Sequence, residues 1–299
     1  RCLYFNTRHK KNIVKKILLI GSSGYIGSEL SNFLSNKGYE INKVDNLRRP
    51  SSKKEKSSNF FQNDYQNLDE DFLNSHTDCI WLAGHSSVQD SLNSPKEALN
   101  NNFYDLISLR DRFKNRLIYA SSGSVYSRDI AEYCDENSPT MIPKNIYDFT
   151  KISFDNYLIS NERNGIGLRF GTVNGVSQNM KKELMINSMI KSFKDSGEIN
   201  IMNKDFFRPI LWINDLLQAI DAILESSTQT GIYNLASFNS SIGELGKEIK
   251  SITGAKLNDL GNTKTYNFMM KTQKFEKEFN FEFKGSIFSI VDSLLDFDY

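Results

Sequence analysis

The segment YDFTK, residues 147–151, places a phenol and an ammonium group four positions apart. On a helix such positions share one face, so the Tyr147 and Lys151 side chains would project into the same site. A neighbouring positive charge favours the phenolate and lowers the pKa of a tyrosine from its reference value near ~10, which makes a base able to work near neutral pH. The same spacing is also common where a half-buried aromatic lies beside a solvated lysine.

Ser122 is the third residue that suggests chemistry. It ends the apolar run RLIYASS, residues 116–122, and is followed by GSVYS. A hydroxyl at the end of a strand can orient a substrate hydroxyl by hydrogen bonding, although serines in such positions often only cap turns. The candidate catalytic residues are therefore Ser122, Tyr147 and Lys151. Whether they are catalytic depends on whether the preceding part of the chain binds a nucleotide cofactor.

Gly21, Gly24 and Gly27 form a G-x-x-G-x-x-G pattern after the apolar run KKILLIG. Small residues at a strand-to-helix turn let the backbone turn tightly, approach a pyrophosphate and pack the helix on the strand. The helix N-terminus adds positive potential. The pattern predicts a nucleotide-binding turn, with an ordinary strand-to-helix turn as the alternative.

Asp45 ends the next apolar run, YEINKVD, close to the ~20-residue offset at which a carboxylate hydrogen-bonds the adenosine ribose. A carboxylate there favours NAD over NADP because it repels a 2′-phosphate. Arg48 and Arg49 follow closely and keep NADP open as the alternative. A solvated aspartate before a loop is the structural alternative.

These residues need a parallel sheet to bring them together. Strand-like runs alternate with amphipathic segments through the first half of the chain, which is typical of βαβ units. The expected strands are residues 15–21, 39–45, 78–84, 116–122 and 165–171, and the expected helices are 26–37, about 95–113 and about 147–161. A further helix is expected over 214–224, with Asn214 or Asp215 at its N-cap, and a short strand over 231–237.

The fold class predicted from this order is α/β, a Rossmann-type doubly wound parallel sheet with a smaller C-terminal substrate-binding lobe. Residues 1–12 are basic, lack an initial methionine and are expected to form a tail outside the fold. Residues 13–170 would form the NAD-binding domain, with segments near 205–236 returning to it. Residues 171–299 would form mainly the substrate-binding lobe.

The composition of the chain limits the kinds of partner that it is expected to bind. The 299 residues carry a formal net charge of +1, so the basic surface expected of a nucleic-acid binder or a membrane-surface protein is absent. No apolar run approaches the ~20 residues that span a bilayer. The three cysteines and three histidines lack metal-ligand spacing. We expect a cytoplasmic protein with a small-molecule substrate and no metal, nucleic-acid or membrane partner.

Taken together, these segments resemble the extended short-chain dehydrogenase/reductase family of nucleotide-sugar epimerases, dehydratases and reductases. The resemblance covers most of the chain from Lys16 onward. It rests on GSSGYIG, VDNL, QNDY, WLAG, SSVQDS, SSGSVY, YDFTK, LRFGTVNG, RPILWINDL and GIYNLAS, together with Asn102.

The resemblance implies roles for individual residues. Ser122, Tyr147 and Lys151 look like the family's catalytic triad, Asp64 like its adenine contact and Arg208 like its diphosphate-binding arginine. The implied cofactor contacts are Gly21, Gly24, Tyr25, Ile26, Gly27, Asp45, Asn46, Asp64, Leu82, Ala83, Gly84, Asn102, Tyr147 and Lys151. The implied substrate contacts are Ser86, Ser87, Ser122, Ser124, Thr172 and Arg208.

The chain also departs from the family pattern. Asp148 stands where a glycine usually follows the tyrosine, and Thr172 replaces a frequent asparagine. No arginine follows Arg208, so the late R-x-G-D diphosphate clamp is missing. Gly123 and Ser124 occupy the positions of the Asp-Glu pair that water-eliminating members usually carry, which argues against a 4,6-dehydratase.

The resemblance therefore implies an NAD-dependent nucleotide-sugar epimerase that oxidises the sugar transiently at its C4 hydroxyl. An NAD(P)H-dependent nucleotide-sugar 4-ketoreductase is the first alternative, since both need the same triad. A non-catalytic NAD(P)-binding sensor is the second, and the intact triad argues against it. The resemblance also implies a homodimer that pairs through the helices expected over 95–113 and 147–161.

Overall fold

A computed structural model describes residues 15–48, 57–127, 131–161 and 164–298. The expected tail over residues 1–12 lies outside the described residues. Among those described, no helix is long and apolar enough to cross a membrane.

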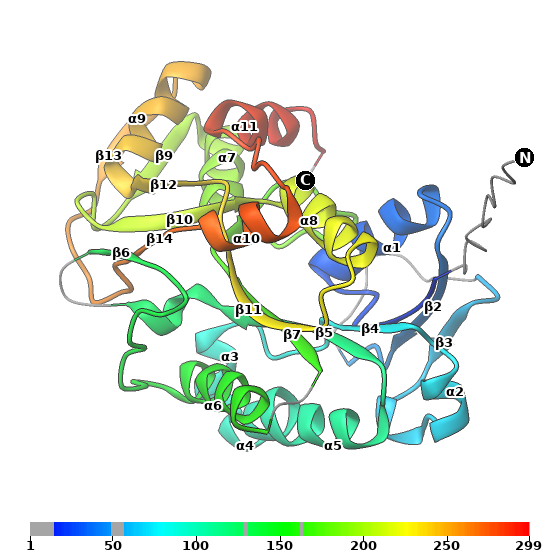
Figure 1. Cartoon of the computed structure of the whole chain (residues 1–299). Coiled ribbons are helices and arrows are strands. Elements are labelled where there is room, and N and C mark those ends of the chain that lie inside the picture. Colours follow the sequence, from blue (N-terminus) through cyan, green and yellow to red (C-terminus); the bar gives the residue numbers. More distant parts are fainter. Residues whose placement is uncertain (1–14, 49–56, 128–130, 162–163, 299) are drawn as a thin grey trace, which may run out of the picture.

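The centre of the molecule is a seven-stranded parallel sheet with the strand order β11-β7-β5-β4-β1-β2-β3 (Figure 1). Its strands are mainly apolar and buried, as expected of a sheet covered on both faces. The bounds are β1 Lys16–Ile20, β2 Glu40–Asp45, β3 Phe60–Gln62, β4 Asp78–Trp81, β5 Arg116–Ser122, β7 Gly165–Phe170 and β11 Thr230–Leu235. The predicted α/β, Rossmann-type fold class is confirmed by this topology.

Helices cover both faces of the sheet (Figure 1). α1 packs beside α8 on one face, while α3 and α4 lie against α6 on the other. Separate clusters of buried apolar side chains fill the space on the two sides of the sheet. The bounds are α1 Tyr25–Asn36, α2 Glu70–Asn74, α3 Val88–Asn93, α4 Pro95–Leu99, α5 Asp105–Arg112, α6 Ile146–Ser160 and α8 Ile213–Glu225.

Most of the remaining elements build the smaller lobe, which has its own apolar cluster. Three short sheets have the orders β12-β10-β8, β13-β9 and β14-β6. Their strands are β6 Tyr133–Cys134, β8 Thr172–Asn174, β9 Glu198–Ile201, β10 Phe207–Trp212, β12 Phe238–Ser241, β13 Lys256–Asp259 and β14 Met269–Met270. The helices are α7 Met185–Ser196, α9 Ile242–Thr253 and α11 Ile287–Leu295, whereas α10 Gln273–Phe279 packs against β11 of the central sheet.

One local prediction was wrong, and another lacked a detail. The helix expected over 95–113 is present from Pro95 to Arg112, but a π-helical turn, η2 Asn100–Tyr104, lies between α4 and α5. Helix α8 begins one residue before the expected cap, with Trp212 as its N-cap. Asp215 does not cap this helix because its carboxylate accepts hydrogen bonds from the Ser237 hydroxyl and from the Lys284 and Gly285 amides.

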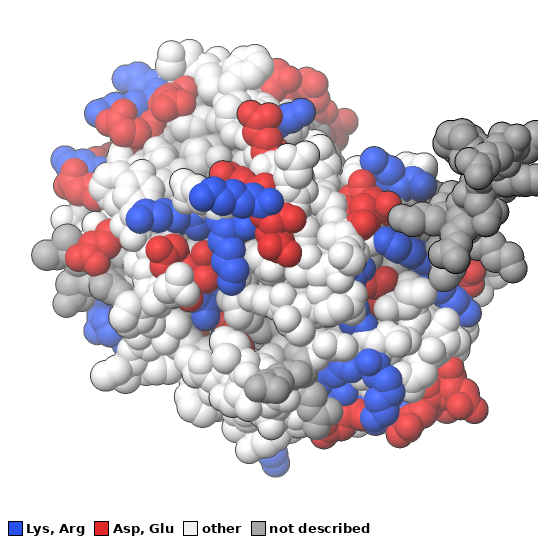
Figure 2. Space-filling model, in the orientation of Figure 1, with Lys and Arg blue, Asp and Glu red and all other residues white. Residues whose placement is uncertain are grey.

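The charged side chains are distributed over the surface. Figure 2 shows acidic and basic residues interspersed on the face in view, without a continuous basic area there. This distribution agrees with the formal net charge of +1. On this face, nothing provides the stripe of positive charge that follows a nucleic-acid backbone.

Candidate active site

The glycine turn joins β1 to the N-terminus of α1, as its spacing predicts. Gly21 has φ +87°, and a Cβ there would lie 2.5 Å from the Ala83 amide nitrogen, so a side chain would be both strained and obstructed. A Cβ at Gly27 would overlap the Gly21 carbonyl oxygen. Gly24 is the N-cap of α1 and has no side-chain cap, so it leaves the first amides of the helix available to an anion.

The turn suits the pyrophosphate of a dinucleotide. Ser22 has a buried hydroxyl that finds no hydrogen-bond partner among the described residues. Buried polar groups of this kind are normally paired, so a ligand or water that hydrogen-bonds Ser22 would complete the turn. The bare helix N-terminus and the narrow glycine backbone therefore fit a bound dinucleotide.

The residues predicted to hold the adenosine half cluster at the carboxyl ends of β2 and β3. The Asp45 carboxylate accepts hydrogen bonds from the Ser23 and Leu47 amides, both at 2.9 Å, which fixes it beside the glycine turn. The Asn46 amide lies 3.2 Å from the Asp64 carboxylate, which also caps the short helix η1 Tyr65–Asn67. Asp45 keeps some exposure to solvent and can accept further hydrogen bonds.

The three candidate catalytic side chains come from β5 and α6. Ser122 ends β5, and Tyr147 and Lys151 share one face of α6. The Lys151 Nζ lies 5.7 Å from the centre of the Tyr147 ring, and Ser122 lines the same pocket as these two side chains. Sequence spacing predicted this face of the helix, and the parallel sheet places Ser122 opposite it.

The electrostatics of the pair follow from its burial. Burial raises the pKa of Tyr147, the hydrogen bond with Ser122 lowers it, and the neighbouring Asp148 raises it. Burial lowers the pKa of Lys151 to about 8, against the opposing effect of Asp155 one turn along the helix. The Lys151 ammonium donates to the Ala120 carbonyl at 2.8 Å, which holds α6 on β5.

Asn102 lies on the π-helical turn, and its side chain is close to Lys151 of α6. Its amide donates to the His85 carbonyl at 3.0 Å. Its Oδ1 is buried, and no hydrogen-bond partner for it occurs among the described residues. A Cβ built at Gly84 would lie 2.9 Å from this oxygen and 3.5 Å from the Lys151 Nζ, so only glycine leaves this space open.

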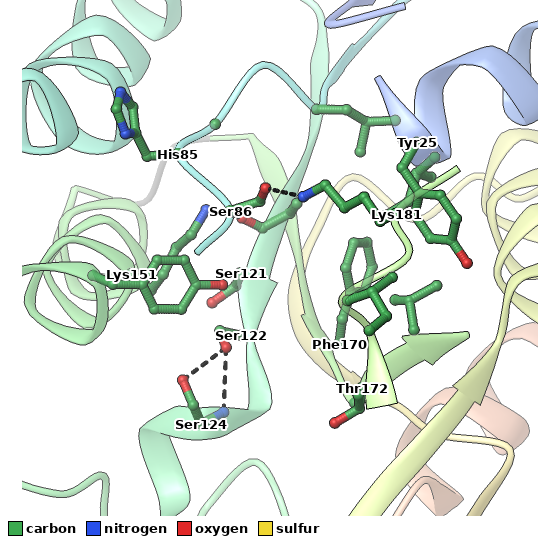
Figure 3. Close-up of a pocket in the computed structure, with 18 of the residues that line it drawn as sticks. Tyr25, His85, Ser86, Ser121, Ser122, Ser124, Lys151, Phe170, Thr172 and Lys181 are labelled. Atoms are coloured by element: carbon green, nitrogen blue, oxygen red, sulfur yellow. Dashed lines mark hydrogen bonds between the residues drawn. The ribbon is translucent and has the colours of Figure 1, made fainter. Parts of the chain in front are cut away.

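The glycine turn and the catalytic face open into one pocket of about 290 Å³ (Figure 3). Its described lining contains the cations Lys151, Lys181 and Arg208 and no aspartate or glutamate. The Lys181 side chain extends from the segment after β8 and donates to the Ser86 hydroxyl at 2.5 Å, so it crosses this part of the pocket (Figure 3). A lining with three cations and no carboxylate suits a ligand that carries phosphates.

Arg208 lies in β10, at the end of the pocket formed by the smaller lobe. The guanidinium donates to the Phe207 and Tyr266 carbonyls and to the Thr265 hydroxyl, and no carboxylate pairs with it among the described residues. Burial lowers the pKa of Arg208 to about 10. A buried guanidinium without a counter-ion would be stabilised by an anionic ligand.

Most of the predicted site residues line the pocket. Those lining it are Gly21, Gly24, Tyr25, Ile26, Gly27, Leu82, Gly84, Ser86, Ser122, Ser124, Tyr147, Lys151, Thr172 and Arg208. The others, Asp45, Asn46, Asp64, Ala83, Ser87 and Asn102, lie outside this lining. Ser87 instead caps α3, where its hydroxyl accepts from the Asp90 amide.

Sequence reasoning missed Lys181, Tyr266 and Phe268, which line the pocket from the smaller lobe. Lys181 and Tyr266 stand in irregular segments without periodicity or a motif. The only available signal was their order in the chain, after the last strands of the nucleotide-binding half, and that signal does not identify single residues.

Comparison with known proteins identifies the family. A sequence profile described as the NAD dependent epimerase/dehydratase family matches residues 17–236. This chain belongs to that family. Its membership confirms the resemblance seen in the sequence, an enzyme of the epimerase/dehydratase type, and NAD as the cofactor.

Individual relatives have low sequence identity to this chain. The chain is 27% identical over 259 residues to the ADP-L-glycero-D-manno-heptose-6-epimerase of Brachyspira hyodysenteriae, an alignment that covers 79% of this chain and 80% of the relative. Two of the solved structures that share the fold serve as examples. MoeE5 in complex with UDP-glucuronic acid and NAD has a TM-score of 0.81 at 19% identity, covering 94% of this chain and 98% of that one.

The second structure is the UDP-glucose 4-epimerase of Thermotoga maritima with UDP-glucose. It has a TM-score of 0.79 at 20% identity and covers 94% of this chain and 96% of that one. At these identities the structural likeness establishes the fold alone.

Proposed function

We propose that this enzyme is an NAD-dependent nucleotide-sugar epimerase that acts by transient oxidation at the sugar C4 hydroxyl. The observation that carries the proposal is the convergence of Ser122, Tyr147 and Lys151 on one pocket with the glycine turn and Arg208. The heptose epimerase, MoeE5 and the UDP-glucose 4-epimerase provide parallel cases of sugar nucleotides handled on this fold.

Each group of residues has a part in the proposed reaction. The glycine turn and Asp45 hold the cofactor, and Arg208 and Lys181 hold the substrate diphosphate. Tyr147 removes the hydroxyl proton, Lys151 stabilises the phenolate and Ser122 orients the hydroxyl. NAD held by the glycine turn and Asp45 would supply reversible hydride transfer at the sugar carbon.

A 4-ketoreductase would use the same residues, and the two functions differ in how the cofactor is retained. An epimerase regenerates its cofactor in every cycle and has no need to release it, whereas a reductase exchanges it. We therefore expect denaturation of the purified protein to release NAD, identified by its mass and absorbance. A protein that is purified empty and oxidises added NADH or NADPH with a 4-keto sugar nucleotide would favour the reductase.

The catalytic assignment is tested with Tyr147→Phe and a panel of UDP-, ADP- and dTDP-sugars. Product formation is followed by proton NMR at every ring and side-chain carbon, because the heptose epimerase is named for position 6. We expect Tyr147→Phe to bind cofactor normally and to lose turnover by about 10²- to 10⁴-fold. A fully active variant would refute Tyr147 as the base.

A further inference from the structure

Asp148 is a buried acid next to the proposed base, and the proposed reaction does not use it. Its side chain follows Tyr147 on α6, is fully buried and does not belong to the described lining of the pocket. One carboxylate oxygen accepts a hydrogen bond from the Ser124 hydroxyl at 2.6 Å. The other accepts from the Asn145 amide at 2.6 Å and from the Tyr266 hydroxyl at 2.8 Å. The last of these contacts joins α6 to a segment 118 positions later in the chain.

The Tyr266 hydroxyl is bound to the first turn of α6. It accepts a hydrogen bond from the Asn145 side-chain amide at 2.9 Å and donates one to Asp148 at 2.8 Å. Asn145 is the N-cap of this helix, and its side-chain oxygen accepts from the Asp148 backbone amide at 2.9 Å. Because Tyr147 lies in the same turn, the Tyr266 hydroxyl is held at a fixed position relative to the proposed base.

Tyr266 also contacts Arg208 on the substrate side of the pocket. The Arg208 guanidinium donates to the Tyr266 carbonyl and, at 2.9 Å, to the hydroxyl of the preceding Thr265. The following residue, Asn267, accepts from the Phe207 amide at 2.9 Å and so holds the same segment along β10. A single residue, Tyr266, therefore contacts the proposed diphosphate-binding arginine through its backbone and the catalytic helix through its side chain.

We infer that Asp148 is a positioning residue for the substrate, because it fixes the Arg208 guanidinium relative to Tyr147 through the Tyr266 hydroxyl. The inference rests on the proposed function, in which Arg208 holds the diphosphate and Tyr147 removes the hydroxyl proton, and it adds what sets the spacing between them. The sugar ring separates its diphosphate from its C4 hydroxyl. Both ends are in place together only if the two protein groups keep a fixed separation.

Two departures of this chain from the family pattern agree with this role. No arginine follows Arg208, so the late diphosphate clamp is missing, and Arg208 is the only arginine in the described lining of the pocket. The orientation of this one guanidinium therefore has a large effect on how a diphosphate binds. Asp148 stands where glycine is usual in the family, and a glycine would have no side chain to hold Tyr266.

A positioning role has to be distinguished from a purely structural one, since Asp148 also takes part in the cap of α6. The cap itself uses the Asn145 side-chain oxygen and the Asp148 backbone amide. It does not use the Tyr266 hydroxyl. Removal of that hydroxyl therefore leaves the cap in place and tests the positioning role by itself.

Tyr266→Phe is the decisive variant, because it removes the hydroxyl and keeps the ring in the pocket wall. We expect the KM for the sugar nucleotide to rise about 10-fold, while kcat stays within about threefold of wild type and the Kd for NAD is unchanged. Tyr39→Phe is the matched control. It removes a hydroxyl that donates to the Asp221 and Glu225 carboxylates at 2.9 and 2.6 Å, outside the described pocket lining, and should leave KM unchanged.

Asp148→Ala and the double variant show whether the two residues act through one contact. Asp148→Ala should raise KM by a similar factor, and the double variant should have no higher KM than the weaker-binding single variant. Losses that multiply in the double variant would show that the Tyr266 hydroxyl acts independently of Asp148 and would overturn the inference. The melting temperature measures folding separately. If Asp148→Ala is unstable, Tyr266→Phe still decides the question, because a wild-type KM in that variant would also overturn it.

A measurement without cofactor or substrate separates this inference from the proposed function. Nitrogen-15 NMR follows hydrogen exchange of the Arg208 guanidinium, whose signals are identified by their loss in Arg208→Lys. Exchange should be about 10-fold faster in Tyr266→Phe and unchanged in Tyr39→Phe, because the released segment lets the guanidinium leave its acceptors more often. Unchanged exchange in Tyr266→Phe would contradict the positioning role even in an active epimerase. Faster exchange would support it in a protein that turns over no sugar nucleotide, so the two hypotheses fail on different measurements.

Discussion

Lys151 lines the pocket and also contacts the central sheet. Its ammonium group donates to the Ala120 carbonyl and lies beside the Tyr147 ring, within a buried setting that disfavours its charge. The Asp155 carboxylate one turn along α6 partly offsets that cost and is itself paired with Arg169 at 2.9 Å. The charge that activates Tyr147 is therefore maintained by residues behind the pocket.

This setting predicts a pH dependence. Burial lowers the pKa of Lys151 to about 8, so the ammonium form is present below that pH and is lost above it. Turnover should therefore fall as the pH rises through about 8, because the phenolate loses its neighbouring charge. Lys151→Met should be slower by about 10²-fold at neutral pH and should lack this decline in its kcat profile.

The Lys151 ammonium group also makes the free energy of unfolding depend on pH. This free energy should increase with pH, whereas turnover should decrease. An unfolded lysine titrates near ~10.4, so between about pH 8 and that value the unfolded chain binds more protons than the native one. The free energy of unfolding of wild type relative to Lys151→Met should therefore increase with pH in this window. Denaturant titrations that give the reverse slope would contradict the lowered pKa.

At the scale of elements, the β1–α1 turn needs glycine for two reasons, packing of the helix and space for the cofactor. Single substitutions can separate the two. Gly27 allows α1 to pack against the turn, whereas Gly24 has φ −76° and ψ 177°, which alanine adopts readily. We expect Gly27→Ala to lower both the melting temperature and NAD affinity. Gly24→Ala should keep the melting temperature within a few degrees and weaken NAD binding, because its methyl group occupies the space of the pyrophosphate.

Thermal unfolding and equilibrium binding of NAD test this pair together. Equal losses of stability in the two variants would show that Gly24 also has a packing role. Full NAD affinity in Gly24→Ala would show that the dinucleotide does not approach the turn at this residue.

The elements also show what sequence could predict. The glycine turn, the Tyr147–Lys151 face of α6 and six strands of the sheet follow from local spacing and hydrophobic runs. The π-helical turn at 100–104 does not, because its residues continue a helical pattern and its irregularity comes from packing. Lys181 and Tyr266 reach the pocket through tertiary contacts; the Tyr266 hydroxyl bonds Asp148 across 118 positions of sequence.

At the scale of the whole molecule, the pocket depends on how the two lobes are joined. Asp215 lies in the first turn of α8, and its carboxylate accepts hydrogen bonds from the Lys284 and Gly285 amides of the C-terminal segment. Arg208 donates a hydrogen bond to the Tyr266 carbonyl, and the Tyr266 hydroxyl donates one to the Asp148 carboxylate. The substrate side and the catalytic side of the pocket are therefore linked by a few buried polar contacts.

Assembly is the prediction at this scale. Large apolar side chains remain exposed on α3, η2 and α6, namely Leu92, Tyr104, Phe149 and Ile159. We expect the helical segment over 95–113 and α6 to pair with their mates in a homodimer, as the family resemblance implies, because burial of apolar side chains there would stabilise it. Sedimentation velocity at micromolar concentration should show a dimer, and Ile159→Asp should shift it to monomer. A wild-type protein that sediments only as a monomer would contradict this assembly.

The central claim is that the enzyme inverts a sugar carbon by removing and returning the same hydrogen. The most direct test is to run the reaction in D₂O with the sugar nucleotide that the protein converts, and to examine the inverted carbon by NMR and mass spectrometry. The account predicts inversion with the original hydrogen retained and no deuterium at that carbon, together with loss of the reaction in Tyr147→Phe. Deuterium at the inverted carbon would show exchange of that proton with solvent and would contradict transient oxidation.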